Sequence, residues 1–212
     1  MISNKRAPWI GVLLSCVFLF GTVAAQADTL ARRQNLTDLI GYADVIIHGD
    51  VVSVTDGFEK NIPYTEVTVK VKETLRGSVP ETYTFRQFGL LKPRSMGNGL
   101  VNYNVTPVDW ATYTPHEEVV LFLYKSASKT GLRTTVGLGQ GKFTISGGRI
   151  TSQQGNVGLF QAIDLDAGLL NKAEREMFAT AKGPVNSAAF LTLVRRAVGE
   201  KWVETRKMSH AK

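Results

Sequence analysis

The stretch Tyr64–Leu75, YTEVTVKVKETL, carries the clearest signal for the fold. Thr or Val stands at every second position from 65 to 71, and charged or polar residues stand between them: Glu66, Thr68, Lys70 and Lys72. A period of two is expected for a strand with one face buried and the other in water. The stretch therefore predicts a half-buried strand within a sheet.

Further strands are predicted on both sides of this stretch. A segment rich in β-branched residues precedes it, and a loop punctuated by Asp56-Gly57 and Asn61-Ile62-Pro63 separates the two. The run Glu118–Tyr124, EVVLFLY, is continuously apolar, as expected for a strand buried on both faces. A Gly147-Gly148 turn predicts a tight hairpin. The other strand-like segments are 45–54, 81–88, 132–136, 142–145 and 149–151, and the strand signal stops after Gln153.

Helices are predicted at the two ends of this region. Residues 36–43 have apolar side chains at helical spacing and follow Asn35, a good N-cap. Residues 169–182 carry strong helix formers and end at Gly183-Pro184, and a further helix begins at Asn186 or Ser187. We therefore expect a β domain at 28–153 and a helical C-terminal extension at 154–212, packed on it and ending in a basic tail.

The first 27 residues are typical of a cleaved secretory signal peptide. Lys5 and Arg6 precede an apolar run at 9–23, which closes on a small-x-small pattern with cleavage expected between Ala27 and Asp28. This predicts a periplasmic or secreted protein. Two alternatives remain, a retained anchor and a lipid-modified Cys16, but bilayer spans need about 20 apolar residues, and a lipobox would end the apolar run.

Charge and cysteine content limit the partners of the exported chain. Cleavage would lower the net charge from +7 to +5 and remove the single cysteine, so stability must come from packing. The basic residues gather at 195–212, where a weak contact with an anionic surface is one interpretation and a solvated helix face is the other. Nucleic acid is disfavoured as a partner because these basic residues are not interleaved with stacking aromatics.

The chain offers no catalytic, cofactor or metal motif. The glycines of 137–141 lie between strand-like segments rather than before a helix, so they favour close backbone approach over a phosphate loop. His48, His116 and His210 are too far apart in sequence for a spaced metal motif. Glu117 and Glu118 are adjacent on a strand, so they point to opposite faces and would not share a substrate. We expect no enzyme, cofactor or metal here.

The segment 89–115 shows no period and contains several Gly and Pro residues, so it predicts a long loop that is functional or loosely ordered. Aromatic and Arg side chains dominate binding hot spots. The candidate partner-contact residues in this loop are Lys92, Arg94, Tyr103, Trp110 and Tyr113. The alternative is that Trp110 folds back and covers the open end of a barrel.

An ordered set of motifs resembles a group of uncharacterised exported bacterial proteins over about residues 36–146. The set is ADVIIHGDVVSV (43–54), YT (64–65) leading to KETLRG (72–77), EEVVLFL (117–123) and VGxxQGKF (136–143). More distantly it is similar to netrin-type and metalloproteinase-inhibitor domains, which implies an OB-like Greek-key barrel of five or six strands. Those inhibitors chelate zinc through an N-terminal cysteine and carry disulfides, whereas Asp28 would be the new terminus here.

The resulting functional hypothesis is an exported, non-enzymatic binding module. It would contact a protein or an envelope polymer through the 89–115 loop and a barrel face. An inhibitor of a secreted metalloprotease and an enzyme acting on an envelope substrate are the alternatives.

Overall fold

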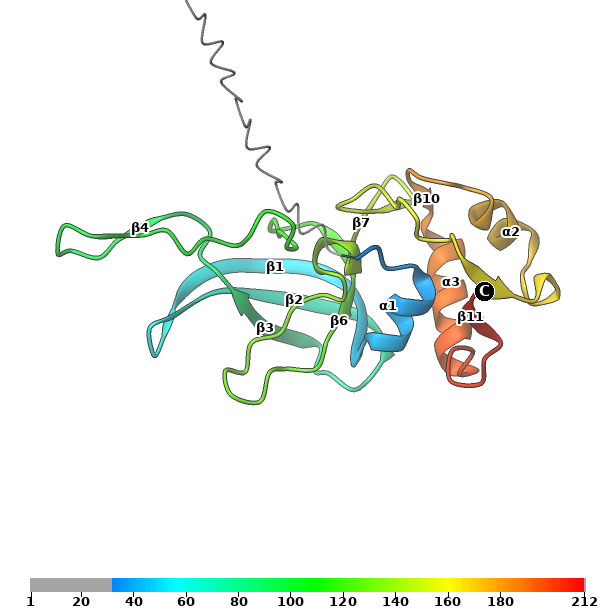
Figure 1. Ribbon diagram of the computed structural model, residues 1–212, viewed down its shortest axis with the longest axis horizontal. Helices are drawn as coiled ribbons and strands as arrows, with labels where there is room; N and C mark the ends of the chain where they lie inside the picture. Colours follow the sequence, from blue (N-terminus) through cyan, green and yellow to red (C-terminus); the bar gives the residue numbers. More distant parts are fainter. Residues whose placement is uncertain (1–31, 212) are drawn as a thin grey trace, which may run out of the picture. The chain divides into compact units, whose positions relative to one another are not determined.

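The structure of the protein is a computed structural model that describes residues 32–211. The expected signal peptide, with Cys16 and the cleavage site between Ala27 and Asp28, lies outside the described residues. The prediction of a mostly-β protein is confirmed, because a large antiparallel sheet dominates this part of the chain (Figure 1).

The large sheet has seven strands in the order β10-β8-β7-β6-β1-β2-β3, and each neighbouring pair is antiparallel. Two small sheets accompany it, β4 with β5 and β9 with β11. The strands are β1 Val45–Glu59, β2 Ile62–Arg76, β3 Thr82–Phe88, β4 Arg94–Ser95, β5 Val101–Asn102, β6 Glu118–Leu123, β7 Lys142–Ser146, β8 Arg149–Ser152, β9 Ile163–Leu165, β10 Val185–Asn186 and β11 Met208–His210. The helices are α1 Leu36–Tyr42, α2 Lys172–Phe178 and α3 Ser187–Gly199, with 3-10 turns η1 Leu138–Gly141 and η2 Ala167–Leu169.

The β1–β2 hairpin is longer than the sequence suggested. The loop expected at 56–63 is wrong, because β1 continues to Glu59 and only Lys60 and Asn61 form the turn. Both turn residues have positive φ, +48° and +66°, which matches the twist of antiparallel strands. Gly57 lies inside the ladder, where an added Cβ would come within 2.8 Å of the Tyr64 hydroxyl. This glycine makes room for a cross-strand ring rather than a turn.

Strand β6 has a hydrophobic core on each of its faces. Val120 and Phe122 face a core shared with α1, α3 and β7, in which Phe143 and Phe190 meet at 5.0 Å between ring centroids. The alternate residues of β6 face a second core inside the curve of β1, β2 and β3. The prediction of a doubly buried strand at 118–124 is therefore confirmed.

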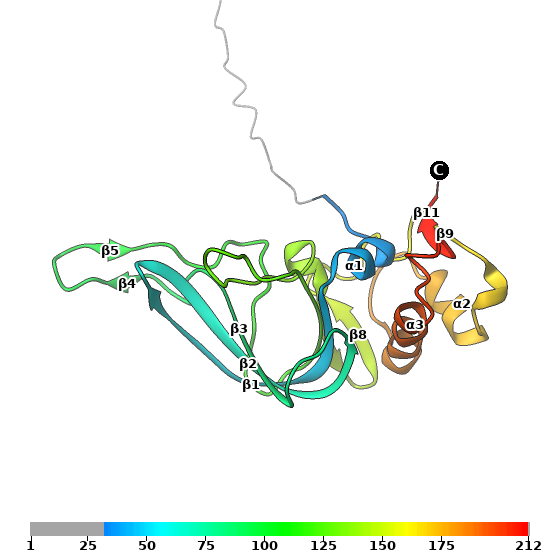
Figure 2. The same cartoon turned by 90° about the horizontal axis from the view of Figure 1, so that it is seen from below.

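The sheet curves strongly but does not close into a barrel (Figure 2). Its edges are β3 and β10, and the strand expected at 132–136 is not a strand. That segment makes backbone hydrogen bonds to the end of β6, from Tyr124 N to Thr134 O and from Val136 N to Phe122 O. Within residues 32–211, this segment makes one backbone hydrogen bond to β3, from Arg133 N to Arg86 O at 2.7 Å. Closure requires a ladder of such bonds, so the expectation of a closed barrel is corrected to an open, curved sheet.

The helical C-terminal region also contributes strands. Asn35 and Asn186 cap α1 and α3 as predicted, each accepting a hydrogen bond from a backbone amide. The helix expected at 169–182 is shorter, because Asn171 caps α2 and the helix ends at Phe178. The strand signal does not stop at Gln153, since β9, β10 and β11 follow and β10 adds to the edge of the large sheet. The C-terminal region is thus joined to the sheet by backbone pairing.

Candidate functional site

Residues 90–108, called the arm below, leave the end of β3 and extend beyond the large sheet as a narrow hairpin (Figure 1). Leu90 donates to Asn104 O and accepts from Thr106 N, both at 2.9 Å, and these bonds close its root. Gly89 has φ +106°, and an added Cβ would stand 2.5 Å from the backbone of Thr106. Only glycine therefore lets the outgoing and returning chains approach this closely.

Asp56 of β1 fastens the root of the arm to the sheet. Its carboxylate accepts a hydrogen bond from Leu91 N at 2.8 Å and forms an ion pair with Arg94. The Arg94 guanidinium also lies over the Phe58 ring, 5.6 Å from its centroid. Arg94 is thus a structural residue of the arm, with its charge already neutralised.

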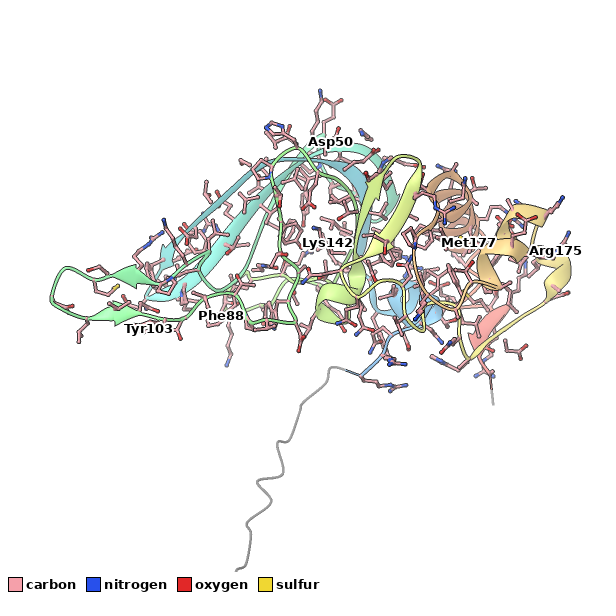
Figure 3. The ribbon with its side chains drawn as sticks, turned by 90° about the horizontal axis from the view of Figure 1, so that it is seen from above. Asp50, Phe88, Tyr103, Lys142, Arg175 and Met177 are labelled. Atoms are coloured by element: carbon pink, nitrogen blue, oxygen red, sulfur yellow. The ribbon has the colours of Figure 1, made fainter. Side chains whose placement is uncertain are left out.

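The arm carries most of the large apolar side chains that are exposed among residues 32–211. Six of the nine are on it, and the three most exposed are Val108 at 93 %, Tyr103 at 72 % and Leu100 at 64 %. Tyr103 is marked on the arm in Figure 3. Lys92 is exposed as well. Tyr103 and Lys92 are therefore the two candidate residues that the structure leaves open to solvent on the arm; the other exposed apolar residues there are Leu91, Met96 and Val101.

Trp110 lies just beyond the arm at the side of an apolar groove of about 320 Å³. It packs against Phe88 with 6.4 Å between the ring centroids and is half-buried. The hydroxyl of Thr134, which also lines the groove, is buried without a hydrogen-bond partner. Concave apolar surfaces with a few polar groups are typical of binding sites. The groove is lined by Phe88, Trp110, Tyr124, Lys125, Ala127, Thr130, Leu132, Arg133 and Thr134.

Tyr113 is a core residue rather than an exposed contact residue, and its selection as a contact is corrected. Its ring is buried against Phe85, edge to face at 5.7 Å, and the Lys142 ammonium lies 5.3 Å from its centroid. Burial raises the pKa of the Tyr113 hydroxyl far above its usual value. The side chain stabilises the core inside the curve of β1, β2 and β3, called the inner core below, and is not available to a partner.

Glu117 directly precedes β6 and Glu118 is its first residue, and the two side chains point to opposite faces of the sheet, as predicted. Glu117 accepts from Lys142 Nζ at 2.7 Å in a pair that is mostly buried. Glu118 lies on the outer face, where it accepts from Lys72 Nζ at 2.9 Å and contacts His48 Nε2 at 2.8 Å. The bond from Lys72 holds the pKa of Glu118 below its usual value, and the bond to Asp50 raises the pKa of Lys72. Each carboxylate already has a cationic partner, so both are structural ion pairs.

The three histidines lie apart in the fold. His48 is on the outer sheet face, His116 is exposed at a turn with φ +71°, and His210 contacts Asp38 at 3.0 Å. Within residues 32–211 there is no group of three or more His, Cys, Asp or Glu side chains that could hold a metal ion. Gly139 and Gly141 lie in η1, and Gly137 is its N-cap. A Cβ on Gly141 would clash with the Val136 carbonyl, so the prediction of close backbone approach is confirmed.

The basic C-terminal segment is partly neutralised by ion pairs. Arg195 of α3 makes two hydrogen bonds to the carboxylate of Glu73, at 2.7 and 2.8 Å. Arg196 donates to the fully buried Glu174 of α2 at 2.9 Å. Two of the basic residues in the 195–212 segment thus attach α3 to the sheet and to α2.

Comparison with known proteins returns no matching family model, no matching curated protein and no matching solved structure. In the part of the chain that the structure describes, no helix has both the length and the apolar character needed to cross a membrane.

The exposed apolar residues of the arm were not predicted as contact residues, because only the aromatic and basic side chains of this irregular segment were taken as candidates. A signal was present nonetheless: Asp and Glu are absent from 90–108, while Leu, Val and Met recur among the glycines. The role of Asp56 had no local signal, since it depends on a contact between residues 35 positions apart.

Proposed function

We propose that this protein is an exported, non-enzymatic binding module of the bacterial envelope or extracellular space. It engages a protein or an envelope polymer through the 89–115 segment and the groove beside Trp110. The groove is the observation that carries the proposal, because it combines an aromatic wall, an apolar floor and a buried hydroxyl without a partner. A protruding side chain or a sugar ring of the partner would stack on Trp110 and Phe88.

Ala127 and Ala173 offer a matched pair of positions for the test. Ala127 lines the groove, whereas Ala173 is an exposed alanine on α2. A photo-crosslinking phenylalanine analogue at Ala127 is expected to give discrete adducts in the native host, and the same analogue at Ala173 is not. Trp110→Ser is expected to remove the adducts while the thermal unfolding of the purified variant stays close to that of the parent.

The chemistry of the adducts separates the two partner classes. After proteolysis of the purified adduct, a peptide of another protein attached to position 127 identifies a protein partner, and a glycan attached to that position identifies an envelope polymer. Absence of adducts from Ala127, or identical adducts from both positions, would refute the proposal. The alternatives of an inhibitor and an enzyme stay predictions.

The finer fold proposal is that β6, β1, β2, β3 and the segment 132–136 form an OB-like barrel left incompletely closed. Support comes from the order of pairing and from the bond between Arg133 N and Arg86 O, which joins the two sides of the opening. Amide hydrogen exchange tests it: the Arg133 amide should be protected to nearly the same extent as the amides of β3. Exchange at the rate of a free loop would show that the opening is not bridged.

A further inference from the structure

The tip of the arm, defined as residues 96–103, differs from the groove because it is convex and projects into solvent. Met96, Leu100, Val101 and Tyr103 are 44–72 % exposed on it. The arm extends away from the large sheet and the helices (Figure 1), and β4 and β5 are only two residues long each. Exposed apolar groups gathered on one feature mark an interaction surface.

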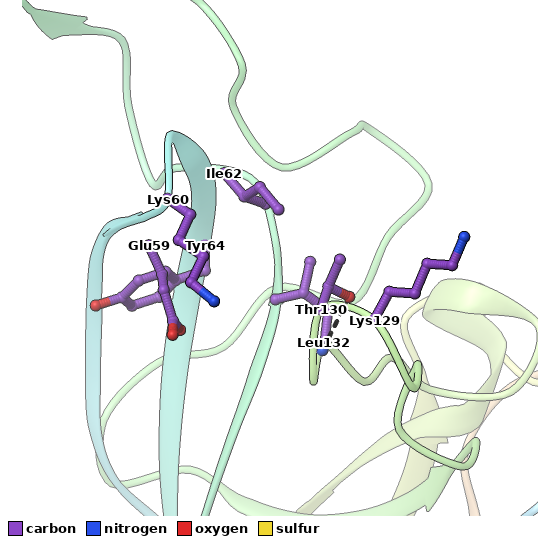
Figure 4. Close-up of a pocket in the computed structure, with 7 residues that line it drawn as sticks. All are labelled: Glu59, Lys60, Ile62, Tyr64, Lys129, Thr130 and Leu132. Carbon is purple, nitrogen blue, oxygen red and sulfur yellow. Dashed lines mark hydrogen bonds between the residues drawn. The ribbon is translucent and has the colours of Figure 1, made fainter.

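The cations near the arm give this surface a charge preference. Lys92 is exposed close to the root, and Lys60 is exposed at the β1–β2 turn, which lies at the same end of the sheet (Figures 1 and 2). Lys60 and Lys129 both line a small hollow of about 50 Å³ (Figure 4). Among residues 32–211, these three ammonium groups have no carboxylate within ion-pair distance.

Two acidic groups near the root of the arm are neutralised, whereas Asp109, directly after the arm, is exposed and has no ion pair among residues 32–211. Asp56 is paired with Arg94, and Glu59 is paired with Arg86 at 2.8 Å. The arm itself has no acidic residue. The arm thus combines exposed apolar side chains and a tyrosine with unpaired lysines near its root. This combination fits a lipid surface, where apolar groups enter the acyl region, Tyr lies at the interface and Lys faces anionic headgroups.

We propose that the arm tip inserts into the surface of an anionic lipid bilayer, with Lys60, Lys92 and Lys129 facing the headgroups. A bilayer is favoured over a protein because a fluid surface accommodates a narrow convex tip without a preformed cavity. This inference goes beyond the proposed function: it assigns the tip of the 89–115 segment to the bilayer and leaves the groove beside Trp110 to the partner, and it does not depend on the groove. Bound in this way, the module would work at a membrane while the groove beside Trp110 stays free for a partner.

Vesicle co-sedimentation tests the inference with the chain from Asp28, which contains every described core residue, from Leu36 to Met208. The parent should bind vesicles of equal parts phosphatidylglycerol and phosphatidylcholine more tightly than vesicles of phosphatidylcholine alone. Leu100→Ser with Val101→Ser should weaken partitioning about tenfold, because two exposed apolar side chains no longer transfer from water. Val52→Ser removes an apolar residue that is 49 % exposed on β1 and should leave partitioning unchanged.

Charge reversal separates recognition of anionic lipid headgroups from nonspecific hydrophobic adsorption. Lys60→Glu with Lys92→Glu should reduce the preference for anionic vesicles about tenfold or more, since each lysine near the surface contributes about 1 kcal/mol, a factor of about five. Circular dichroism of each variant should match that of the parent, because every substituted side chain is exposed.

Three results would overturn the inference: no binding to either vesicle, undiminished binding by the Leu100 and Val101 double variant, or crosslinking from position 100 to a protein in place of lipid. Failure here with persistent adducts from Ala127 would leave the proposed function standing. Vesicle binding without adducts from Ala127 would remove the proposed groove function and keep the lipid contact.

Discussion

Replacing Lys142 with methionine tests the assignment of the Glu117–Lys142 pair to the structural core. The side chains are only 14 % and 8 % exposed and meet at 2.7 Å, so Lys142→Met leaves a buried carboxylate without its cation. Loss of one partner of a buried pair costs about 3–5 kcal/mol. Glu117 keeps a bond from Thr114 N at 2.9 Å, which places the expected loss at the lower end, about 3 kcal/mol.

Urea unfolding followed by circular dichroism measures this loss. With a slope of about 2 kcal/mol per molar urea, the midpoint should fall by about 1.5 M at constant slope. The double variant Lys142→Met with Glu117→Leu should recover to within about 1 kcal/mol of the parent, because no charge is then left unpaired. Lys72→Met is the exposed control and should cost less than about 1 kcal/mol.

Two outcomes would refute this reasoning. The first is a loss below about 1 kcal/mol for Lys142→Met, which would mean that water reaches Glu117 and that the pair is not buried. The second is a loss of unfolding free energy in the double variant that equals the sum of the losses in Lys142→Met and Glu117→Leu, which would mean that the two side chains do not interact.

Three further outcomes follow from the arm and from the outer ion pairs. Gly89→Ala should lower the free energy of unfolding in urea by about 2 kcal/mol or more, because the site has positive φ and no room for a Cβ. Gly97→Ala, at positive φ but in open space, should cost about 1 kcal/mol or less. Equal losses in the two variants would contradict this account. Asp56→Asn should weaken the root of the arm and speed proteolysis within it about tenfold, and an unchanged cleavage pattern would show that the root is fastened elsewhere. The bonds from Arg195 hold the pKa of Glu73 below its usual value of 4.5, so their stabilisation is present above about pH 4.5 and is lost as the pH falls through the folded pKa. In thermal unfolding between pH 2 and 7, Glu73→Gln should therefore show a smaller fall below pH 4.5 than the parent does; parallel curves would argue against the pair.

Local signals predicted the elements whose structure depends on their own residues. Asn35 is followed three positions later by Asp38, and the two form a complete capping box at α1. The two-residue period at 64–72 predicted β2, and the apolar run at 118–124 predicted a strand with both faces covered. In each case the residues that decide the structure lie within one segment, so the local sequence is sufficient to predict the element.

Local signals failed where a distant segment decided the outcome. Gly57 reads as a turn residue, but the Tyr64 ring on the facing strand occupies the space beside it. Tyr113 reads as a loop aromatic, but Phe85 and Lys142 enclose it. The segment 132–136 reads as a strand, yet its backbone bonds mainly to the end of β6 and makes a single backbone hydrogen bond to β3.

Patterns along the chain were sufficient to predict the mostly-β class, the strand with two buried faces, the helix caps at Asn35 and Asn186 and the segment with the candidate binding residues. Which residues of that segment are exposed depends on tertiary contacts. Arg94 is held by Asp56, Tyr113 is buried in the inner core, and the apolar side chains of the arm stay in solvent. The physical reason is that periodicity reports how one segment divides between water and a core, whereas exposure in an irregular loop depends on which distant side chains it meets.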